Sequence, residues 1–596
     1  MMQNEGAVAK GIKRLANALT ALTDKVEKIN SKAPEHIAVA LYVIMHMLMS
    51  LVHEPWFDEA LSWLIARDSS LYEIFFVTPH YEGHPALWHL ILVPFAKLGA
   101  PYELSLSIVS LVFSGLAMAL FIYKAPFKRI IRLIVPFSYY LFYQYGVISR
   151  PYCMMMLAFV LMAMAFKNRN EKPGRYVLSL WFLCISSAYG IVIAGGVCIV
   201  WGAETISTFV REHIIAKGKI FWLLGLLFYV IFILWRIIPA ENTYASIISG
   251  SSTDENGLLI RILYSLFAST SDLFITNIFY TSGTLRNASF FYTEFISGVV
   301  VGLGILAAFI LYAKNHLSKM KASCLLLLYF IIPYLFYTIF GAIVYLYYHH
   351  IGISLLLIGF WLWTVTDFGR LDSVRGNITD ISDVSEKASK VSDDNKQRLY
   401  ALGKFTVVLM VIIPIYWTIS SCIVDVCNPY GSGREQYEFL NENGLDEGYT
   451  ILTDWYKVFD TENVPENYTE YDLIFSQQGV NLAPYLKKSI IINTPDIIGK
   501  SYSYLHEIPD KAGMIEIYNK VVENGNPDII VGRPDFVETE KTLEIHNPTH
   551  VECNDYVQVY KGDFGNIKKG FRMDTSTCIY VKKDLAEKLG IKEIDQ

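Results

Sequence analysis

The chain has 596 residues, of which 53% are apolar and 14% aromatic, and its mean hydropathy is +0.34. This is more hydrophobic surface than the core of a soluble protein of this size can bury, so the composition excludes a soluble globular protein and indicates a polytopic membrane protein. The formal net charge of −6 is unevenly distributed, because roughly 29 acidic and 17 basic residues follow Asn428 and leave the preceding part net basic. We therefore expect the acidic tail and the basic loops to face different compartments.

The N-terminal stretch Ala7–Ile29 places its apolar residues on one helical stripe among lysines. This pattern predicts an amphipathic cytoplasmic helix within residues 1–35, with a coiled-coil partner helix as the alternative. About eleven of the apolar stretches that follow are long enough to cross a bilayer. We expect these spans at residues 36–53, 103–123, 130–147, 152–166, 176–189, 190–207, 220–238, 293–312, 322–345, 351–366 and 402–424.

A further apolar segment, His84–Leu98, is short, opens with His84-Pro85 and carries His89 in its middle, so it predicts an in-plane or re-entrant helix. If it does not cross, every later basic loop falls on the cytoplasmic side with the N-terminus, as the positive-inside rule requires. The first outer loop, 54–102, and the tail, 428–596, are then extracytoplasmic. Helical periodicity in Leu258–Ile275 predicts a surface helix lying on the membrane.

The segments around the last span differ in composition. The linker 367–401 is charged and rich in Ser and Asp, which predicts a disordered cytoplasmic segment. Of the eight cysteines, only Cys553 and Cys578 could pair. The tail alternates β-rich runs with helix-like stretches, which predicts a small α/β domain. The runs are Thr450–Leu452, Ser489–Ile492, Asp528–Val531, Tyr556–Tyr560 and Thr577–Val581, and the helix-like stretches are Arg434–Asn443, Lys511–Asn524 and Leu585–Leu589.

An acidic pair, Asp58 and Glu59, lies directly after the first apolar span, within the sequence Trp56–Trp63. A carboxylate at membrane depth costs roughly 2.5–3.5 kcal/mol on insertion scales. The pair therefore indicates an active site, and the alternative is an interfacial acid that caps the short helix beginning near Trp56.

Three other polar clusters share the outer face with this pair. His80–His89 contains three histidines and Glu82; Arg150 stands beside Tyr152 at a helix junction; and His349 and His350 begin a later span. Each has a simpler interpretation: solvated histidines, a snorkelling arginine and an aromatic belt, respectively.

Together these clusters resemble the GT-C superfamily of multispanning glycosyltransferases that use polyprenyl-phosphate sugars, which includes protein O-mannosyltransferases and bacterial aminoarabinose transferases. Trp56–Glu59 looks like the first-loop Asp-Glu motif of that family, Gly83–Leu87 looks like its His-Pro-Pro-Leu motif, and Ser149–Tyr152 looks like its Ala-Arg-x-Tyr motif. The resemblance covers roughly residues 36–366. It implies a GT-C-like catalytic module, a cell-envelope location in a bacterial plasma membrane and an extracytoplasmic active site.

The sequence also departs from the family pattern. Ala86 replaces the second proline, and no arginine precedes the second span. The stretch Cys153–Met156 lacks the acidic residue that many relatives place there, which weakens the case for a bridging divalent metal, although the sequence does not exclude one.

The resemblance implies transfer of a sugar, with inversion, from a polyprenyl-phosphate donor to a hydroxyl or amine on a glycan, lipid or protein, without nucleic acid. Asp58 would be the general base, and Glu59 would orient it or contact the acceptor. Further candidates are Arg150, His349, His350 and His84 for the donor phosphate, and Trp56, Glu82 and Tyr152 for the acceptor or sugar. The alternatives are a lipid-linked saccharide transporter or flippase and a catalytically silent glycan-binding relative.

Overall fold

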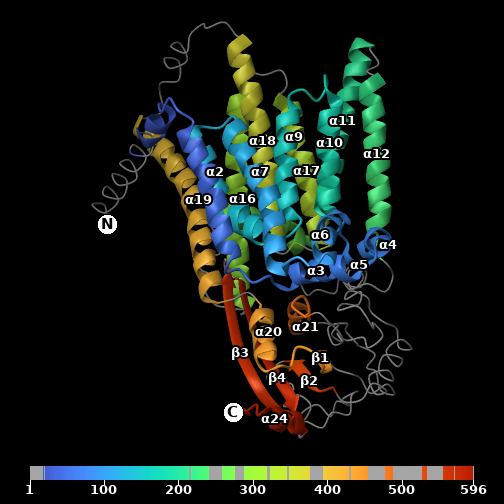
Figure 1. Ribbon diagram of the computed structural model, residues 1–596. Coiled ribbons are helices and arrows are strands. Elements are labelled where there is room, and N and C mark those ends of the chain that lie inside the picture. Colours follow the sequence, from blue (N-terminus) through green and yellow to red (C-terminus); the bar gives the residue numbers. More distant parts are fainter. Residues whose placement is uncertain are drawn as a thin grey trace.

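The structure is a computed structural model in which a bundle of long helices stands on a smaller domain that contains a sheet (Figure 1). It describes residues 18, 21–213, 217–239, 258–274, 288–317, 323–344, 346, 348–375, 393–428, 431–453, 477–486, 527–532, 555–568 and 571–594. The chain is a helical polytopic membrane protein with a C-terminal α/β domain, as the sequence predicts.

Among the described residues, seven helices are long and apolar enough to cross a membrane. They are α2 (Ala33–Ser50), α7 (Tyr102–Lys124), α11 (Ala188–Glu212), α12 (Lys217–Ile237), α17 (Ser323–Ile343), α18 (Tyr348–Arg375) and α19 (Asp393–Cys427). Three more helices occupy expected spans: α9 (Tyr152–Phe166), α10 (Pro173–Ser186) and α16 (Ala288–Leu317). Ten of the expected spans thus coincide with one helix each.

The span expected at residues 130–147 is divided into three pieces. It consists of α8 (Arg129–Ile134), the 3₁₀ turn η1 (Val135–Phe137) and the π-helix η2 (Tyr140–Val147). Pro136 lies at the break, where its missing amide donor and fixed φ disfavour a continuous α-helix. All eight residues of η2 are buried, and π-helical turns are frequent at functional sites.

Four short helices form the loop 54–102 at the lower end of the bundle: α3 (Phe57–Asp68), α4 (Leu71–Phe76), α5 (Thr78–Glu82) and α6 (Leu87–Lys97) (Figure 1). Helix α6 is too short to cross, since 11 residues span about 16 Å of a hydrocarbon core of about 30 Å. Gly83 ends α5 with φ +63°, a conformation that favours glycine, and thereby turns the chain toward α6.

The prediction of a surface helix lying on the membrane at 258–275 is wrong, because the described part of this segment is packed inside the bundle. Here α14 (Leu258–Leu263), η3 (Tyr264–Ala268) and α15 (Ser269–Phe274) pack among the spanning helices. A Cβ atom at Gly302 of α16 would collide with the carbonyl oxygen of Phe267, so the small residue permits this close approach. The Thr270 hydroxyl also lies 2.7 Å from the Tyr334 hydroxyl of α17.

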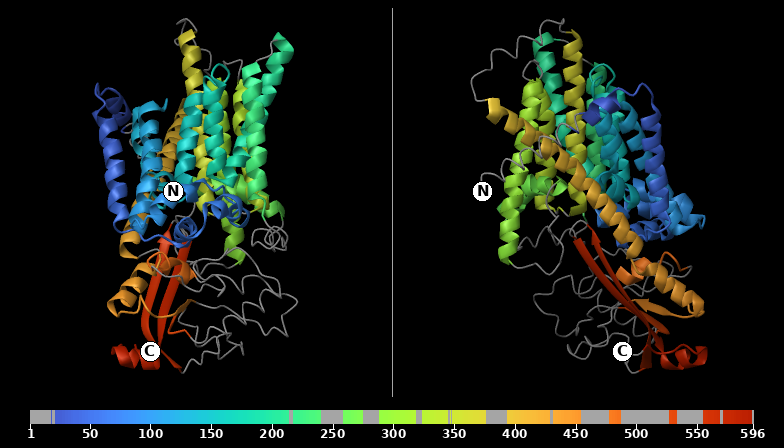
Figure 2. Two further views of the ribbon diagram at one scale, coloured as in Figure 1. Left: turned by 45° about the vertical axis from the view of Figure 1, so that its right-hand side comes forward. Right: turned by 90° about the vertical axis from the view of Figure 1, so that its left-hand side faces the viewer.

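The C-terminal domain contains α20 (Gly433–Glu442), α21 (Gln477–Leu482) and α24 (Lys583–Leu589) beside a four-stranded sheet. Its strands are β1 (Ile451–Thr453), β2 (Ile529–Gly532), β3 (Tyr556–Lys568) and β4 (Phe571–Lys582), in the order β1-β2-β4-β3. Strands β1 and β2 are parallel, and the other two pairs are antiparallel. Both views in Figure 2 show the β3–β4 hairpin rising from the domain toward the bundle.

Most described elements of the tail lie at expected positions, but α21 was not expected and the β3–β4 hairpin is longer than the runs predicted for it. The runs 489–492 and 511–524, most of the N-terminal helix, and Cys553 lie outside the described residues. The linker interpretation needs correction at both ends, because α18 continues to Arg375 and α19 begins at Asp393.

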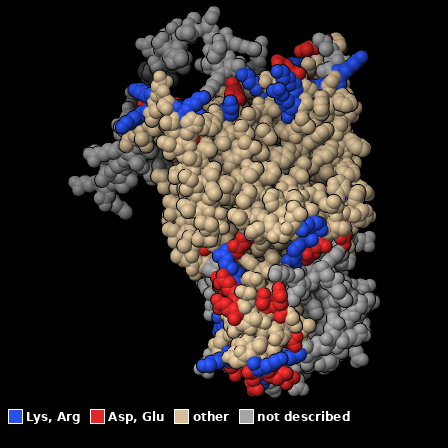
Figure 3. Space-filling model, viewed as in Figure 1, with Lys and Arg blue, Asp and Glu red and all other residues tan. Residues whose placement is uncertain are grey.

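Charged residues separate along the molecule. Figure 3 shows lysines and arginines with some acidic residues at the upper end of the bundle, a broad belt with almost no charge below them, and both signs of charge at the lower boundary of the bundle and on the C-terminal domain. A belt of this kind suits a bilayer core, because charged side chains are costly at membrane depth.

Candidate active site

A hollow opens at the lower end of the bundle, between the loop 54–102 and the junction before α9. Its volume is about 330 Å³, including space open to solvent. The lining residues come from α3, from the end of α5, the turn after it and the start of α6, and from the junction. They are Asp58, Leu61, Ser62, Glu82, His84, Pro85, Trp88, His89, Arg150 and Pro151. The structure thus brings together residues from all three motifs that resemble the GT-C family.

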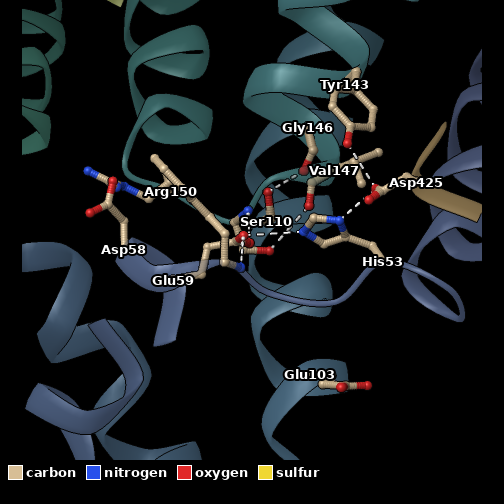
Figure 4. Close-up of polar contacts among 12 residues, drawn as sticks. His53, Asp58, Glu59, Glu103, Ser110, Tyr143, Gly146, Val147, Arg150 and Asp425 are labelled. Atoms are coloured by element: carbon tan, nitrogen blue, oxygen red, sulfur yellow. Dashed lines mark hydrogen bonds and ion pairs between the residues drawn. The ribbon is translucent and has the colours of Figure 1, made fainter. Parts of the chain in front are cut away.

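Asp58 and Arg150 form an ion pair at this hollow (Figure 4). The Asp58 side chain is 27% exposed and the Arg150 side chain 10% exposed, so the carboxylate is the more accessible partner. Asp58 lies in the first turn of α3, where the helix dipole stabilises an anion. The pair therefore places two opposite charges, both partly shielded from solvent, in the lining of the hollow.

Aromatic rings surround the guanidinium of Arg150. Its Cζ lies 5.8 Å from the ring centroid of Trp56 and 5.9 Å from that of Tyr152, within the range of cation–π attraction. The His349 ring lies 6.1 Å from each of these two aromatic rings.

His349 and His350 do not line the hollow. Their ring centroids are 4.1 Å apart, both residues are buried, and the His350 ring packs 4.7 Å from that of Tyr189. Tyr145 of η2 donates a hydrogen bond of 2.7 Å to the His349 carbonyl oxygen. The two histidines therefore form a buried layer behind Arg150.

The acidic pair divides into two environments. Glu59, for which the sequence left open a role in orienting Asp58 or in contacting the acceptor, is fully buried and is not among the residues that line the hollow. Its Oε1 accepts the Ser149 amide at 2.6 Å, and its Oε2 accepts the Trp56 amide at 3.1 Å. Because its oxygens accept bonds from the two chain segments that carry Arg150 and Asp58, Glu59 is placed to orient the pair.

A buried charge network behind Glu59 was not identified from the sequence. His53 Nε2 lies 3.2 Å from Glu59 Oε2, and His53 Nδ1 lies 2.7 Å from Asp425 Oδ2 (Figure 4). Tyr143 of η2 donates to the same Asp425 oxygen at 2.9 Å. One signal was available, since Asp425 is an acid near the end of an apolar span and such residues are seldom there without a partner.

Of the three histidines in the loop 54–102 that the sequence groups together, His84 and His89 line the hollow and His80 does not. His84 lines the hollow beside Glu82. Burial lowers the pKa of His89 to about 4, although the charge of Glu82 opposes this shift, so His89 is neutral at physiological pH. His80 Nδ1 lies 2.7 Å from the Ile238 carbonyl oxygen and helps to hold the end of α12.

The C-terminal domain packs directly against the loop that carries the acidic pair. Arg434 donates to both carboxylate oxygens of Glu103, at 2.9 Å each, and its amide donates to Glu54 Oε1 at 2.9 Å. Arg67 donates to the carbonyl oxygens of Ala483 and Leu486 at 3.1 and 3.2 Å. These contacts hold α20 against α7 and the segment before α3, and they hold α3 against the residues that follow α21.

Glu54 is buried within this contact. Burial, together with the charge of Glu435, raises the pKa of Glu54 to about 8. The folded protein therefore prefers the protonated carboxyl at neutral pH. Within the described ranges no three His, Cys, Asp or Glu side chains converge to hold a metal ion.

Comparison with known proteins gives a likeness in structure only. No family model matches the chain, and no curated protein sequence matches it. Two solved structures of ArnT from Cupriavidus metallidurans each cover 91% of this chain and 97% of their own. The one bound to undecaprenyl phosphate is 11% identical with a TM-score of 0.44, and the apo one is 12% identical with a TM-score of 0.46.

Proposed function

We propose that this protein is a membrane glycosyltransferase that moves a sugar from a polyprenyl-phosphate donor to a hydroxyl or amine acceptor at the extracytoplasmic face. The observation that carries the proposal is the Asp58–Arg150 ion pair at a hollow beside the membrane. A base and a phosphate-binding cation are the two groups that this reaction needs, and here they lie side by side.

In this mechanism Asp58 takes the proton from the acceptor as the acceptor attacks the anomeric carbon. The new bond joins the acceptor oxygen or nitrogen to that carbon. The bond from that carbon to the phosphate oxygen breaks, and the electron pair leaves with the polyprenyl phosphate. Because attack comes from the face opposite the phosphate, the configuration at the sugar inverts.

Arg150 binds the donor phosphate and stabilises the charge that develops on it as the sugar leaves. Its planar guanidinium can donate two parallel hydrogen bonds to phosphate oxygens. In the structure this guanidinium pairs with Asp58. Binding of the phosphate would draw the guanidinium toward it and release the carboxylate to accept a proton.

The surrounding residues take supporting roles in the proposal. His84 lines the hollow and is placed to donate to the phosphate, and Glu82 is placed to accept from the sugar or acceptor. Trp56 and Tyr152 flank Arg150 and hold its guanidinium plane. His349 and His350, which are buried behind this layer, support Tyr152 and do not contact the phosphate directly.

The extracytoplasmic placement of the site rests on the charge distribution. Basic loops are expected on the cytoplasmic side, and Figure 3 shows lysines and arginines at the end of the bundle away from the C-terminal domain. The hollow and that domain then share the outer compartment.

The test is an assay of the purified protein in liposomes with a sugar-labelled polyprenyl-phosphate donor and cell-envelope extracts as acceptor. We expect labelled product and free polyprenyl phosphate in equal amounts. Movement of the intact donor across the bilayer without cleavage would identify a transporter instead. A protein that binds the donor and does neither would be a silent relative.

A further inference from the structure

His53 stands between two buried carboxylates that come from distant parts of the chain. It lies in the loop between α2 and α3, with Asp425 of α19 on one side and Glu59 of α3 on the other. The side chains of all three residues are at most 2% exposed. Arg434 also donates to the backbone carbonyl of His53 at 3.2 Å, so the segment from α19 to α20 holds this residue at two points.

Glu59 connects His53 to the catalytic pair. The oxygen that faces His53 also accepts the Trp56 amide, at the start of the helix that carries Asp58. The other oxygen accepts the Ser149 amide, one residue before Arg150. One carboxylate therefore fixes both backbone segments from which the ion pair extends.

The geometry points to a defined charge on His53. A neutral imidazole has one donor and one acceptor nitrogen, whereas only the protonated ring can donate to carboxylates on both sides. Burial alone lowers the pKa of His53, but the charges of Asp425 and Glu59 outweigh it and raise the pKa to about 9. The groups that face the ring are Asp425 of α19, Glu59 of α3 and, through Asp425, Tyr143 of η2, with His46 of α2 nearby.

A purely structural explanation accounts poorly for this arrangement. Burying charged groups carries a desolvation cost, and their mutual attraction often does no more than balance that cost. A buried triad of charged groups is therefore weak evidence for stability. Such a group is better suited to hold Glu59 in one orientation, because a loosened carboxylate would release two backbone segments at once.

We propose that His53 is a positioning residue which, held by Asp425 and Tyr143, fixes Glu59 and thereby the relative placement of Asp58 and Arg150. This inference rests on the proposed function for its effect on turnover, but its structural step does not. Through Asp425, the last membrane helix becomes part of the support of the active site.

The experiment compares the intact protein with His53→Gln, Asp425→Asn and the double variant, each purified in lipid nanodiscs. The matched control is Glu204→Gln, which breaks the buried Arg169–Glu204 pair. That pair lies at the other end of α9 from Arg150, about 22 Å away by helix length. Each protein is measured for sugar transfer, donor affinity, thermal midpoint and amide hydrogen exchange.

We expect each single variant to lower turnover roughly 10- to 100-fold, the cost of an ångström-scale misplacement, with a smaller loss of donor affinity. The double variant should be no slower than the slower single variant, because both act through one contact. Exchange at the amides of Trp56 and Ser149 should accelerate. The control should lower the thermal midpoint without changing turnover or exchange at these amides.

The two proposals can fail separately. Faster exchange at both amides in a protein that transfers no sugar would overturn the function and keep the positioning role. Unchanged exchange and turnover in both His53→Gln and Asp425→Asn, in a wild type that does transfer sugar, would overturn the positioning role. If His53→Gln does not fold, Asp425→Asn carries the same test.

Discussion

Arg150 pairs with Asp58 across the hollow, so the side chain proposed to bind the donor phosphate neutralises the one proposed as the base. A substitution of either residue therefore also changes the electrostatic environment of the other. Removing the cation leaves a carboxylate without its partner, and removing the carboxylate leaves a cation free to bind phosphate.

The first prediction concerns Arg150. Arg150→Lys keeps the charge but loses the planar two-pronged geometry, so donor affinity and turnover should both fall, with turnover falling more. Arg150→Ala should be worse in both respects. Isothermal titration calorimetry with a polyprenyl-phosphate analogue would measure the affinity, and initial rates of sugar transfer would measure the turnover. The control is Arg169→Lys, at the other end of α9, which should bind the analogue with wild-type affinity. If Arg150→Ala also binds the analogue with wild-type affinity, the donor site lies elsewhere.

The second prediction concerns sidedness. In a background without the exposed Cys324 and Cys427, cysteines at Ser70 and Glu442 should react with an impermeant thiol reagent in intact cells. A cysteine at Lys167, which is also exposed, should react only after permeabilisation. The reverse labelling pattern would overturn the topology and the extracytoplasmic site.

The third prediction concerns the pH dependence of folding through His53. Its folded pKa of about 9 lies above the unfolded value of 6.5, so its contribution is complete below pH 6.5 and is lost as pH rises through 9. The shift corresponds to about 3 kcal/mol, as an order of magnitude. Reversible unfolding followed from pH 6 to 10 should show a fall in stability that His53→Gln largely removes. Parallel curves for the two proteins would contradict the assigned charge.

The fourth prediction concerns attachment of the C-terminal domain through Glu54. Burial and the charge of Glu435 raise its pKa from 4.5 to about 8, so packing of the domain should be strongest below pH 4.5, weaken as pH rises from 4.5 to 8, and change little above that. Glu54→Gln keeps an acceptor for the Arg434 amide and should make protease resistance of the α19–α20 segment independent of pH. Glu442→Gln, an exposed change on α20, should leave the wild-type pH dependence in place.

Much of the fold could be predicted because it depends on hydropathy and charge. Apolar length located the spans, and the residues around Asp58, His84 and Arg150 could be grouped because topology places them on one face. The sequence could not show that Leu258–Phe274 packs inside the bundle, since its apolar stripe suits a lipid surface equally well. That difference depends on Gly302 and Tyr334, which are far away in the chain.

The division of labour within the acidic pair was also beyond sequence reasoning. Adjacent residues of a helix point in different directions, so one of the pair was bound to face away from the hollow, but only the structure shows which. Asp425, one of the two partners of His53, is 372 residues away. Its position near the end of an apolar span suggests that it has a partner, but nothing in the sequence identifies that partner as His53. The burial of His349 and His350 was unpredictable for the same reason, because the residues around them come from the distant elements η2, α9 and α11.

The most direct test of the account is the transfer rate of Asp58→Asn at saturating donor. This change keeps the shape of the side chain and removes its basicity, so transfer should fall by about 10²–10⁴-fold while the protein folds and still binds the polyprenyl-phosphate donor. Ser62→Ala, a conservative change in the lining of the same hollow, should retain most of the activity. Transfer by Asp58→Asn at a rate near that of wild type would contradict the assignment of Asp58 as the base.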